Sequence, residues 1–154
     1  MKGISIWQPH ASLWLLGPKK YETRTRAFPR VLLGQRVAIH AAKADGDLIE
    51  IAAYILNRKV GVEPDERMEA YVAAILSAGY RTCGEMPRGC LIGSVILRES
   101  VAAEQAEDHN GFGDFSTGRF AWRASDSEML AKPVPFRGML GFFDVPDELL
   151  AQAA

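Results

Sequence analysis

The chain has 154 residues, of which 48% are hydrophobic and 24% are charged. This composition supports one globular domain with a buried core and excludes the weakly hydrophobic, highly charged class of disordered proteins. No apolar stretch is long enough to span a bilayer, and Gln8, Pro9 and His10 interrupt the apolar N-terminus before a signal-peptide core could form. We therefore expect a single cytoplasmic domain over residues 1–154, with no membrane association.

The net charge of −1 hides an uneven distribution of charged residues along the chain. Residues 1–43 carry eight Lys or Arg and one acid, Glu22, whereas residues 44–118 carry six bases and thirteen acids. A basic N-terminal third favours local attraction of phosphate groups. The alternative is that these charges only solvate a surface.

Hydrophobic periodicity and turn residues predict short strands and helices in the N-terminal half. A proline suits the start of the first helix, Gly17 suits its end, and Glu50 three residues after Asp47 resembles a capping box. The predicted elements are a strand at 2–7, a helix at 9–16, strands at 21–25 and 37–40, and helices that begin at Asp47 and at Pro64.

The C-terminal half is predicted to be mostly strands. They lie at 90–97, 119–124 and 139–145, with an acidic, glycine-containing mobile connection at 99–118 and a terminal helix opened by Pro146. Strands thus come early, give way to two helices and return as a cluster, which indicates an α+β fold with a small mixed β-barrel and helices packed outside. The absence of strict βαβ alternation disfavours a doubly wound nucleotide-binding fold.

Several familiar sites are missing from the sequence. It has no phosphate-binding glycine loop, no Gly-x-Ser-x-Gly elbow and no paired histidines at helical spacing. Cys83 and Cys90 are too few for a disulfide framework, and their spacing fits no common metal signature. His10, His40 and His109 stand far apart, and the apolar context of His40 is typical of a hydrogen-bonded core histidine. We therefore predict no metal and no cofactor.

The glycine-containing run 108–114 superficially resembles a calcium loop. It lacks the ligand spacing and the closing glutamate of an EF-hand, so a flexible loop is the simpler prediction. If this loop takes part in binding, we expect it to act as a lid, with Phe112 or Phe115 closing over a pocket.

The segment 17–24 places two cations and a carboxylate at alternating positions just after a helix stop. On a strand that begins near Lys20, Glu22 and Arg24 share a face. Paired cations and a carboxylate inside a cleft hold a proton near neutral pH, or bind a base edge and a phosphate together. An exposed strand with ordinary surface ion pairs is the alternative.

The pattern Gly17-x-Lys19-x-x-Glu22-x-Arg24 resembles the Gly-x-Lys-x-x-Glu-x-Arg signature of the ASCH domain family. Supporting matches lie on both sides, in residues 4–11, 39–43 and 137–143, so the resemblance covers the whole chain. It implies a PUA-like fold, in which a small β-barrel is surrounded by helices and a cleft lies beside the signature segment.

The resemblance also implies binding of RNA or of a nucleoside-sized ligand. Lys19, Glu22 and Arg24 are expected to line the cleft. Trp7 is the aromatic side chain most expected to be partly open for base stacking, followed by Trp122. The full set of expected ligand-binding residues is Trp7, Gln8, Pro9, Lys19, Tyr21, Glu22, Arg24, His40 and Lys43.

A few members of the ASCH family hydrolyse RNA or an acetylated cytidine, which makes a hydrolase the alternative. In the amidohydrolase branch the signature lysine is the base, and a threonine occupies the position of Glu22, which cannot replace a hydroxyl nucleophile. The candidate catalytic residues are therefore Lys19, Glu22 and the adjacent Thr23, with Glu104 as a candidate helper carboxylate. A protein-interaction module with a vestigial pocket is the second alternative. The sequence leaves open whether Glu22 pairs with Lys19 or with Arg24.

Overall fold

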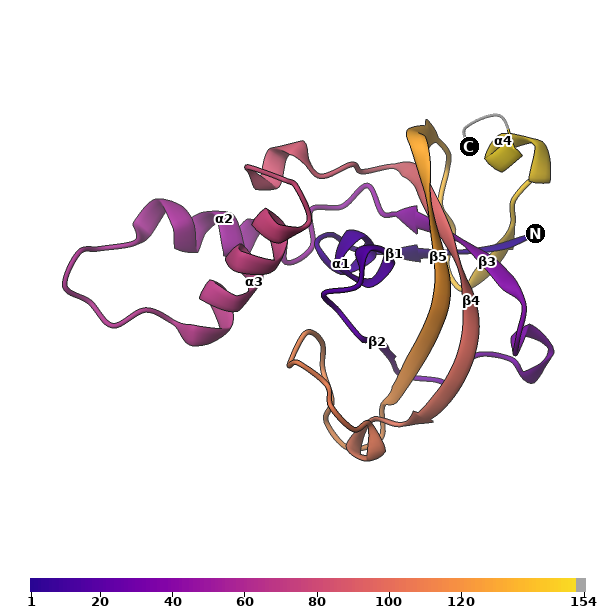
Figure 1. Ribbon diagram of the computed structural model, residues 1–154, viewed down its shortest axis with the longest axis horizontal. Helices are drawn as coiled ribbons and strands as arrows, with labels where there is room; N and C mark the ends of the chain where they lie inside the picture. Colours follow the sequence, from indigo (N-terminus) through magenta and orange to yellow (C-terminus); the bar gives the residue numbers. More distant parts are fainter. Residues whose placement is uncertain (152–154) are drawn as a thin grey trace.

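The computed structural model describes residues 1–151, so the last three residues of the expected domain lie outside the described part. Figure 1 shows a curved sheet with α1 packed in its concavity and a pair of helices extending to one side. The strands are β1 (Lys2–Ile6), β2 (Tyr21–Arg24), β3 (Arg36–Ala41), β4 (Cys90–Ala102), β5 (Phe120–Pro135) and β6 (Phe142–Asp144), and the helices are α1 (His10–Leu16), α2 (Leu48–Asn57), α3 (Glu66–Ser77) and α4 (Asp147–Ala151).

The six strands form one mixed sheet in the order β2-β5-β4-β3-β1-β6. Only β1 and β3 are parallel, with Ile4 opposite Ile39. Within residues 1–151 no ladder joins the edge strands β2 and β6, so the sheet is open and the predicted closed barrel is not confirmed. Both edge strands are very short, and side chains fill the space between them: Trp122 of β5 stacks on Phe142 of β6 with ring centroids 5.7 Å apart.

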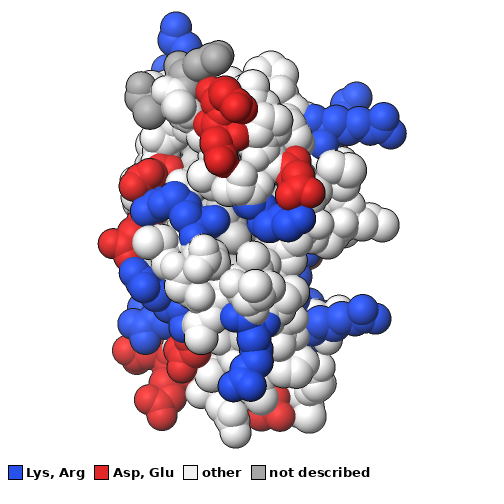
Figure 2. Space-filling model, turned by 90° about the vertical axis from the view of Figure 1, so that its right-hand side faces the viewer, with Lys and Arg blue, Asp and Glu red and all other residues white. Residues whose placement is uncertain are grey.

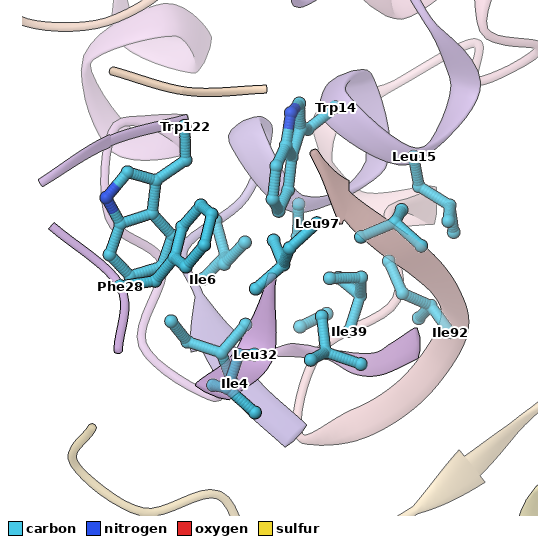
Figure 3. Close-up of a cluster of buried hydrophobic side chains, with 14 of the residues drawn as sticks. Ile4, Ile6, Trp14, Leu15, Phe28, Leu32, Ile39, Ile92, Leu97 and Trp122 are labelled. Atoms are coloured by element: carbon cyan, nitrogen blue, oxygen red, sulfur yellow. The ribbon is translucent and has the colours of Figure 1, made fainter. Parts of the chain in front are cut away.

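The hydrophobic core lies between the concave face of the sheet and α1 (Figure 3). Trp14 reaches it from α1, while Trp122 packs edge-on against Phe28 and donates its indole N–H to the Arg26 carbonyl at 2.9 Å. Trp122 is only 4% exposed, so the expectation that it offers an open stacking face is wrong. Because its indole N–H already has a partner within the protein, Trp122 contributes to stability mainly by filling the core.

Strands β4 and β5 form a longer hairpin than the sequence predicts. The predicted strand 90–97 continues to Ala102, within the segment expected to be a loop, because residues 99–102 pair with 120–123. Three register shifts in this ladder mark bulges, which bend the hairpin around the core. Conversely, the last strand is shorter than predicted, because Met139 and Leu140 are exposed and unpaired with the sheet.

Gly93 of β4 allows α1 to approach the sheet closely, and this contact gives a test of the fold. A β-carbon at Gly93 would lie 2.3 Å from the Glu128 carbonyl oxygen and 2.6 Å from a methyl group of Leu15. We expect Gly93→Ala to destabilise the protein by about 2 kcal/mol, because the backbone cannot yield as a side chain does. Gly84→Ala is the matched control, since its nearest neighbour would be 3.7 Å away. Equal urea midpoints for the two variants would contradict this packing.

The helices α2 and α3, with the loop 58–65 between them, form a helical arm that projects from the sheet (Figure 1). Asp65 caps α3 by accepting the Met68 N–H at 3.0 Å. At its base the arm packs on Leu13 of α1 and on Phe112. Within residues 1–151 no helix is both long enough and apolar enough to cross a membrane.

Candidate functional site

A cleft of about 420 Å³ opens between the signature segment, the base of the helical arm and the loop 111–116. We call it the main cleft. It brings together residues from five separate parts of the chain. Its lining consists of Ser5, Ile6, Trp7, His10, Lys19, Glu22, Thr23, Arg24, Asp47, Arg67, Tyr71, Gly113, Asp114 and Arg119.

Lys19 is placed by the reversal of the chain after α1. Gly17 ends the helix in a left-handed conformation, with φ of 100°, which favours glycine. The Lys19 N–H then donates to the Leu13 carbonyl at 3.0 Å, so the chain folds back against the helix. As a result the Lys19 ammonium is buried beside His10, the first residue of α1.

Glu22 bridges Lys19 and Arg24. Its Oε2 accepts from Lys19 Nζ at 2.6 Å, and its Oε1 accepts from Arg24 Nε at 2.8 Å. Arg24 also donates to the Ser5 carbonyl at 2.8 Å, which ties β2 to β1. Strand alternation thus places Glu22 and Arg24 on one face, as the sequence predicts. Glu22 therefore pairs with both Lys19 and Arg24, because each carboxylate oxygen accepts a hydrogen bond from one of them.

A second chain of contacts leads from Lys19 to Asp47. Lys19 Nζ lies 3.0 Å from His10 Nδ1, and His10 Nε2 lies 2.7 Å from Asp47 Oδ2. The carboxylate accepts the Nε2–H, so Nδ1 is left to accept a hydrogen bond from the ammonium. Asp47 stands at the N-cap of α2 but makes no capping hydrogen bond, so the predicted capping box is wrong. We call Asp47, His10, Lys19, Glu22 and Arg24 the Lys19 cluster.

Burial and neighbouring charges shift the pKa values within the Lys19 cluster. Burial lowers the pKa of Lys19 below its usual value, with Arg24 adding to the shift and Glu22 opposing it. Burial alone would raise the pKa of Glu22, but Lys19 and Arg24 outweigh it, and the pKa lies below its usual value. The hydrogen bond from His10 lowers the pKa of Asp47. Glu22 and Asp47 are therefore carboxylates at neutral pH, and Lys19 gives up its proton more readily than an exposed lysine.

The structure places the expected site residues in different environments. Trp7 lies at the rim with 56% of its surface exposed, as predicted. Thr23 Oγ1 accepts the Asp114 N–H at 3.0 Å and so holds the loop against β2. Exposed Glu104 lies outside the lining of the main cleft.

Five expected ligand-binding residues lie outside this lining. Gln8 is fully buried and donates to Ser12 and to the Pro87 carbonyl. His40 is a core histidine, as predicted, held between Ser5 Oγ and the Phe136 carbonyl. Buried Pro9 precedes α1, Tyr21 lines a second cleft on the other side of Lys19, and Lys43 is exposed.

Sequence reasoning missed several residues of the main cleft. His10 carried one available signal, because a polar residue at the start of a seven-residue helix lies within reach of a lysine that folds back after it. Asp47, Arg67 and Arg119 carried none, since tertiary contacts bring them to the signature segment. The loop lies beside the cleft, with Gly113 and Asp114 in the lining, but neither predicted lid residue lines it: Phe112 is buried against Tyr71, and Phe115 packs edge-on against Tyr21.

The basic N-terminal third does not form one basic surface. Five of its eight cations form ion pairs with carboxylates. Lys19 and Arg24 pair with Glu22 of the same segment. The other three pair with carboxylates outside it: Lys20 with Asp108, Arg36 with Glu128 and Lys2 with Asp144. Figure 2 shows Lys and Arg side chains dispersed over one face, separated by neutral and acidic groups. In the part of the chain that the structure describes, no three His, Cys, Asp or Glu side chains gather as a metal site requires.

The fold is similar to that of solved ASCH structures from Zymomonas mobilis. These are the crystal structures of ASCH itself and of two point variants, with TM-scores of 0.51 and 14% to 15% sequence identity. The similarity covers 98% of this chain and 91% to 94% of those chains. No family model and no curated protein matches the sequence. The chain therefore has the fold of the ASCH domain.

Proposed function

We propose that this chain acts as a single domain that binds single-stranded RNA by holding one nucleoside unit in the main cleft. The observation that carries this proposal is the Lys19 cluster, a hydrogen-bonded set of charges in which Lys19 and Glu22 are buried, at a cleft with an exposed tryptophan on its rim. A volume of about 420 Å³ falls within the range of small-molecule sites and suits one nucleoside.

The chemistry of the Lys19 cluster matches the edge of a nucleobase. A base edge presents donors and acceptors side by side, and Glu22 lies between two cations in the same way. Buried ion pairs contribute little to stability compared with apolar packing, because the charges must be desolvated. Apolar side chains would stabilise the fold at least as well, so a charged cluster that faces a cleft supports a role in binding.

The test is to titrate single-stranded oligoribonucleotides into the protein at two salt concentrations. Phosphate contacts release counterions, so we expect the affinity to fall steeply as salt is raised. A competing DNA oligonucleotide of the same sequence tests the contribution of the 2′-hydroxyl. The absence of RNA binding at low salt would contradict the proposal and favour a protein-interaction module with a vestigial pocket.

Trp7 is expected to stack on the bound base. Trp7→Ala should weaken RNA binding about 10-fold, since base stacking on an aromatic side chain contributes about 1–3 kcal/mol. Trp7→Phe should retain most of the affinity. Leu16→Ala is the control, because Leu16 is also an exposed apolar residue but lies outside the main cleft. If Trp7→Ala binds as tightly as the control, the rim does not contact the base.

Hydrolysis is the second candidate function, and the Asp47–His10–Lys19 chain favours it. A carboxylate that orients an imidazole, which in turn contacts an amine, is an arrangement used for proton transfer. In its neutral form Lys19 would accept the proton of an RNA 2′-hydroxyl as that oxygen attacks the adjacent phosphate. The bond to the 5′-oxygen of the next nucleotide breaks, and the released oxygen takes a proton from water. For an amide such as N4-acetylcytidine, it would accept the proton of the attacking water and return it to the N4 amine as the acyl C–N bond breaks, which gives cytidine and acetate.

Two incubations test hydrolysis, one with single-stranded RNA and one with N4-acetylcytidine. Turnover by the wild type should be lost in Lys19→Ala and reduced in Glu22→Ala and in His10→Ala. Turnover that survives all three substitutions would place the chemistry elsewhere. No turnover in either incubation would leave the protein a binder.

A further inference from the structure

Arg67, at the start of α3, differs from the other cations of the main cleft. Lys19 and Arg24 share Glu22, and Arg119 lies 3.2 Å from Asp114 Oδ2. Within residues 1–151, Arg67 has no carboxylate within ion-pair distance, although its side chain is exposed at the cleft. It is therefore the cleft cation whose charge is available to a ligand.

The position of Arg67 is set by Tyr71, one helical turn further along α3. The guanidinium carbon lies 5.8 Å from the Tyr71 ring centroid, so the side chain rests on the ring face. The same ring packs edge-on against His10, with centroids 5.7 Å apart. Buried Tyr71 thus holds Arg67 on the rim above the His10–Lys19 contact. An anion bound by Arg67 would lie next to the Lys19 cluster.

Arg119 adds a second source of hydrogen-bond donors. Its Nε is buried and, although close to Asp114, makes no hydrogen bond within the described residues. Its Nη2 donates to the Thr23 carbonyl over a long 3.4 Å contact. Apart from His10, the lining holds four cations and three carboxylates, which leaves one positive charge. This surplus equals the single negative charge of a phosphodiester, and it also attracts the more highly charged phosphate monoester.

We infer that the main cleft selects phosphate-bearing nucleotides over neutral nucleosides, with Arg67 as the phosphate contact and Arg119 as its support. This inference rests on the proposed nucleoside cleft and adds the charge of the ligand to it. The phosphate belongs to the nucleotide held in the cleft, so both the base and the phosphate contribute to binding. A guanidinium already held against an aromatic ring loses little freedom when it binds phosphate.

The test compares ligands that differ only in the phosphate. Calorimetric titrations use the four ribonucleosides, their 3′- and 5′-monophosphates, inorganic phosphate and a short single-stranded RNA. For the wild type we expect at least one monophosphate to bind about 10-fold more tightly than its nucleoside. Inorganic phosphate alone should bind weakly, since it lacks the base.

The variants are Arg67→Gln, Arg67→Lys and, as control, Lys59→Gln, which lies on the helical arm outside the main cleft. Arg67→Gln should remove most of the preference for the monophosphate and lower the salt slope of RNA binding by about 1. Arg67→Lys should keep part of the preference. Lys59→Gln should behave as the wild type.

Different failures have different meanings. Equal binding of nucleosides and monophosphates, or an Arg67→Gln variant with unchanged phosphate preference and salt slope, would overturn the phosphate site but leave the nucleoside cleft standing. Equal loss in Lys59→Gln would show that the arm attracts phosphate diffusely, and would also overturn the assignment to Arg67. If no nucleoside, monophosphate or RNA binds, the proposed function fails and the inference fails with it.

Discussion

Lys19→Ala is expected to weaken binding of single-stranded RNA about 100-fold, whereas Lys59→Ala should change it no more than about twofold. Removal of a buried charge that contacts both ligand and protein typically costs about 2–5 kcal/mol, while exposed charges at a rim contribute little. Lys19 is buried between Glu22 and His10, and Lys59 is exposed in the loop after α2. Fluorescence anisotropy with a labelled oligoribonucleotide measures both values under one buffer condition.

Lys19→Met serves as a second variant, because alanine leaves a cavity as well as removing a charge. Circular dichroism and thermal unfolding establish that each variant is folded before its affinity is compared. Equal losses in Lys19→Met and Lys59→Ala would mean that the basic groups act diffusely. In that case the Lys19 cluster would not be the binding site.

Glu22→Gln is expected to lower the free energy of unfolding by about 3 kcal/mol at pH 7, with a fall in Tm of about 10 °C. The substitution keeps the shape of the side chain but leaves Lys19 and Arg24 without their shared carboxylate. Two buried or half-buried cations then face a neutral amide. Glu85→Gln is the control, since its ion pair with Arg81 is exposed and its loss should have no measurable effect on Tm.

The same substitution should change how stability depends on pH. Because the pKa of Glu22 is lowered in the folded protein, the unfolded chain binds this proton more tightly, and stability rises with pH up to about the ordinary value near 4.5. The contribution of Glu22 is therefore complete above that pH and is lost as pH falls through the folded pKa. The free energies of unfolding of the wild type and of Glu22→Gln should therefore converge at acid pH. A constant difference in stability from pH 7 down to acid unfolding would contradict the lowered pKa.

Local sequence patterns predict much of the site because the signature segment is local. The strand that precedes Trp7, the short helix, the glycine stop and the face shared by Glu22 and Arg24 all depend on residues near one another in the chain. Such patterns report backbone periodicity and turn geometry directly. The exposure of Trp7 also follows from its place between a strand and a helix that starts beside a proline.

The remaining features depend on contacts between distant segments. The sequence predicts Asp47 as a helix cap, but in the structure its carboxylate is hydrogen-bonded to His10 and makes no capping hydrogen bond. Trp122 alternates with polar residues, as a solvent-exposed strand residue does. It is nevertheless buried, because it packs against Phe28 and Phe142 between the two edges of the sheet. The open sheet could not be predicted either, because closure depends on whether two short edge strands reach each other. These outcomes are decided by packing and not by local pattern.

The most direct test of the nucleoside cleft is to follow the three tryptophan indole N–H signals by NMR while a short single-stranded RNA is added. Trp7 lines the main cleft, Trp14 lines the second cleft, and Trp122 is enclosed in the core, so the three signals report separate places. We predict a saturating shift of the Trp7 signal, with Trp14 and Trp122 nearly unchanged. A shift of Trp14 without Trp7, or RNA binding that leaves all three signals in place, would contradict binding in the main cleft.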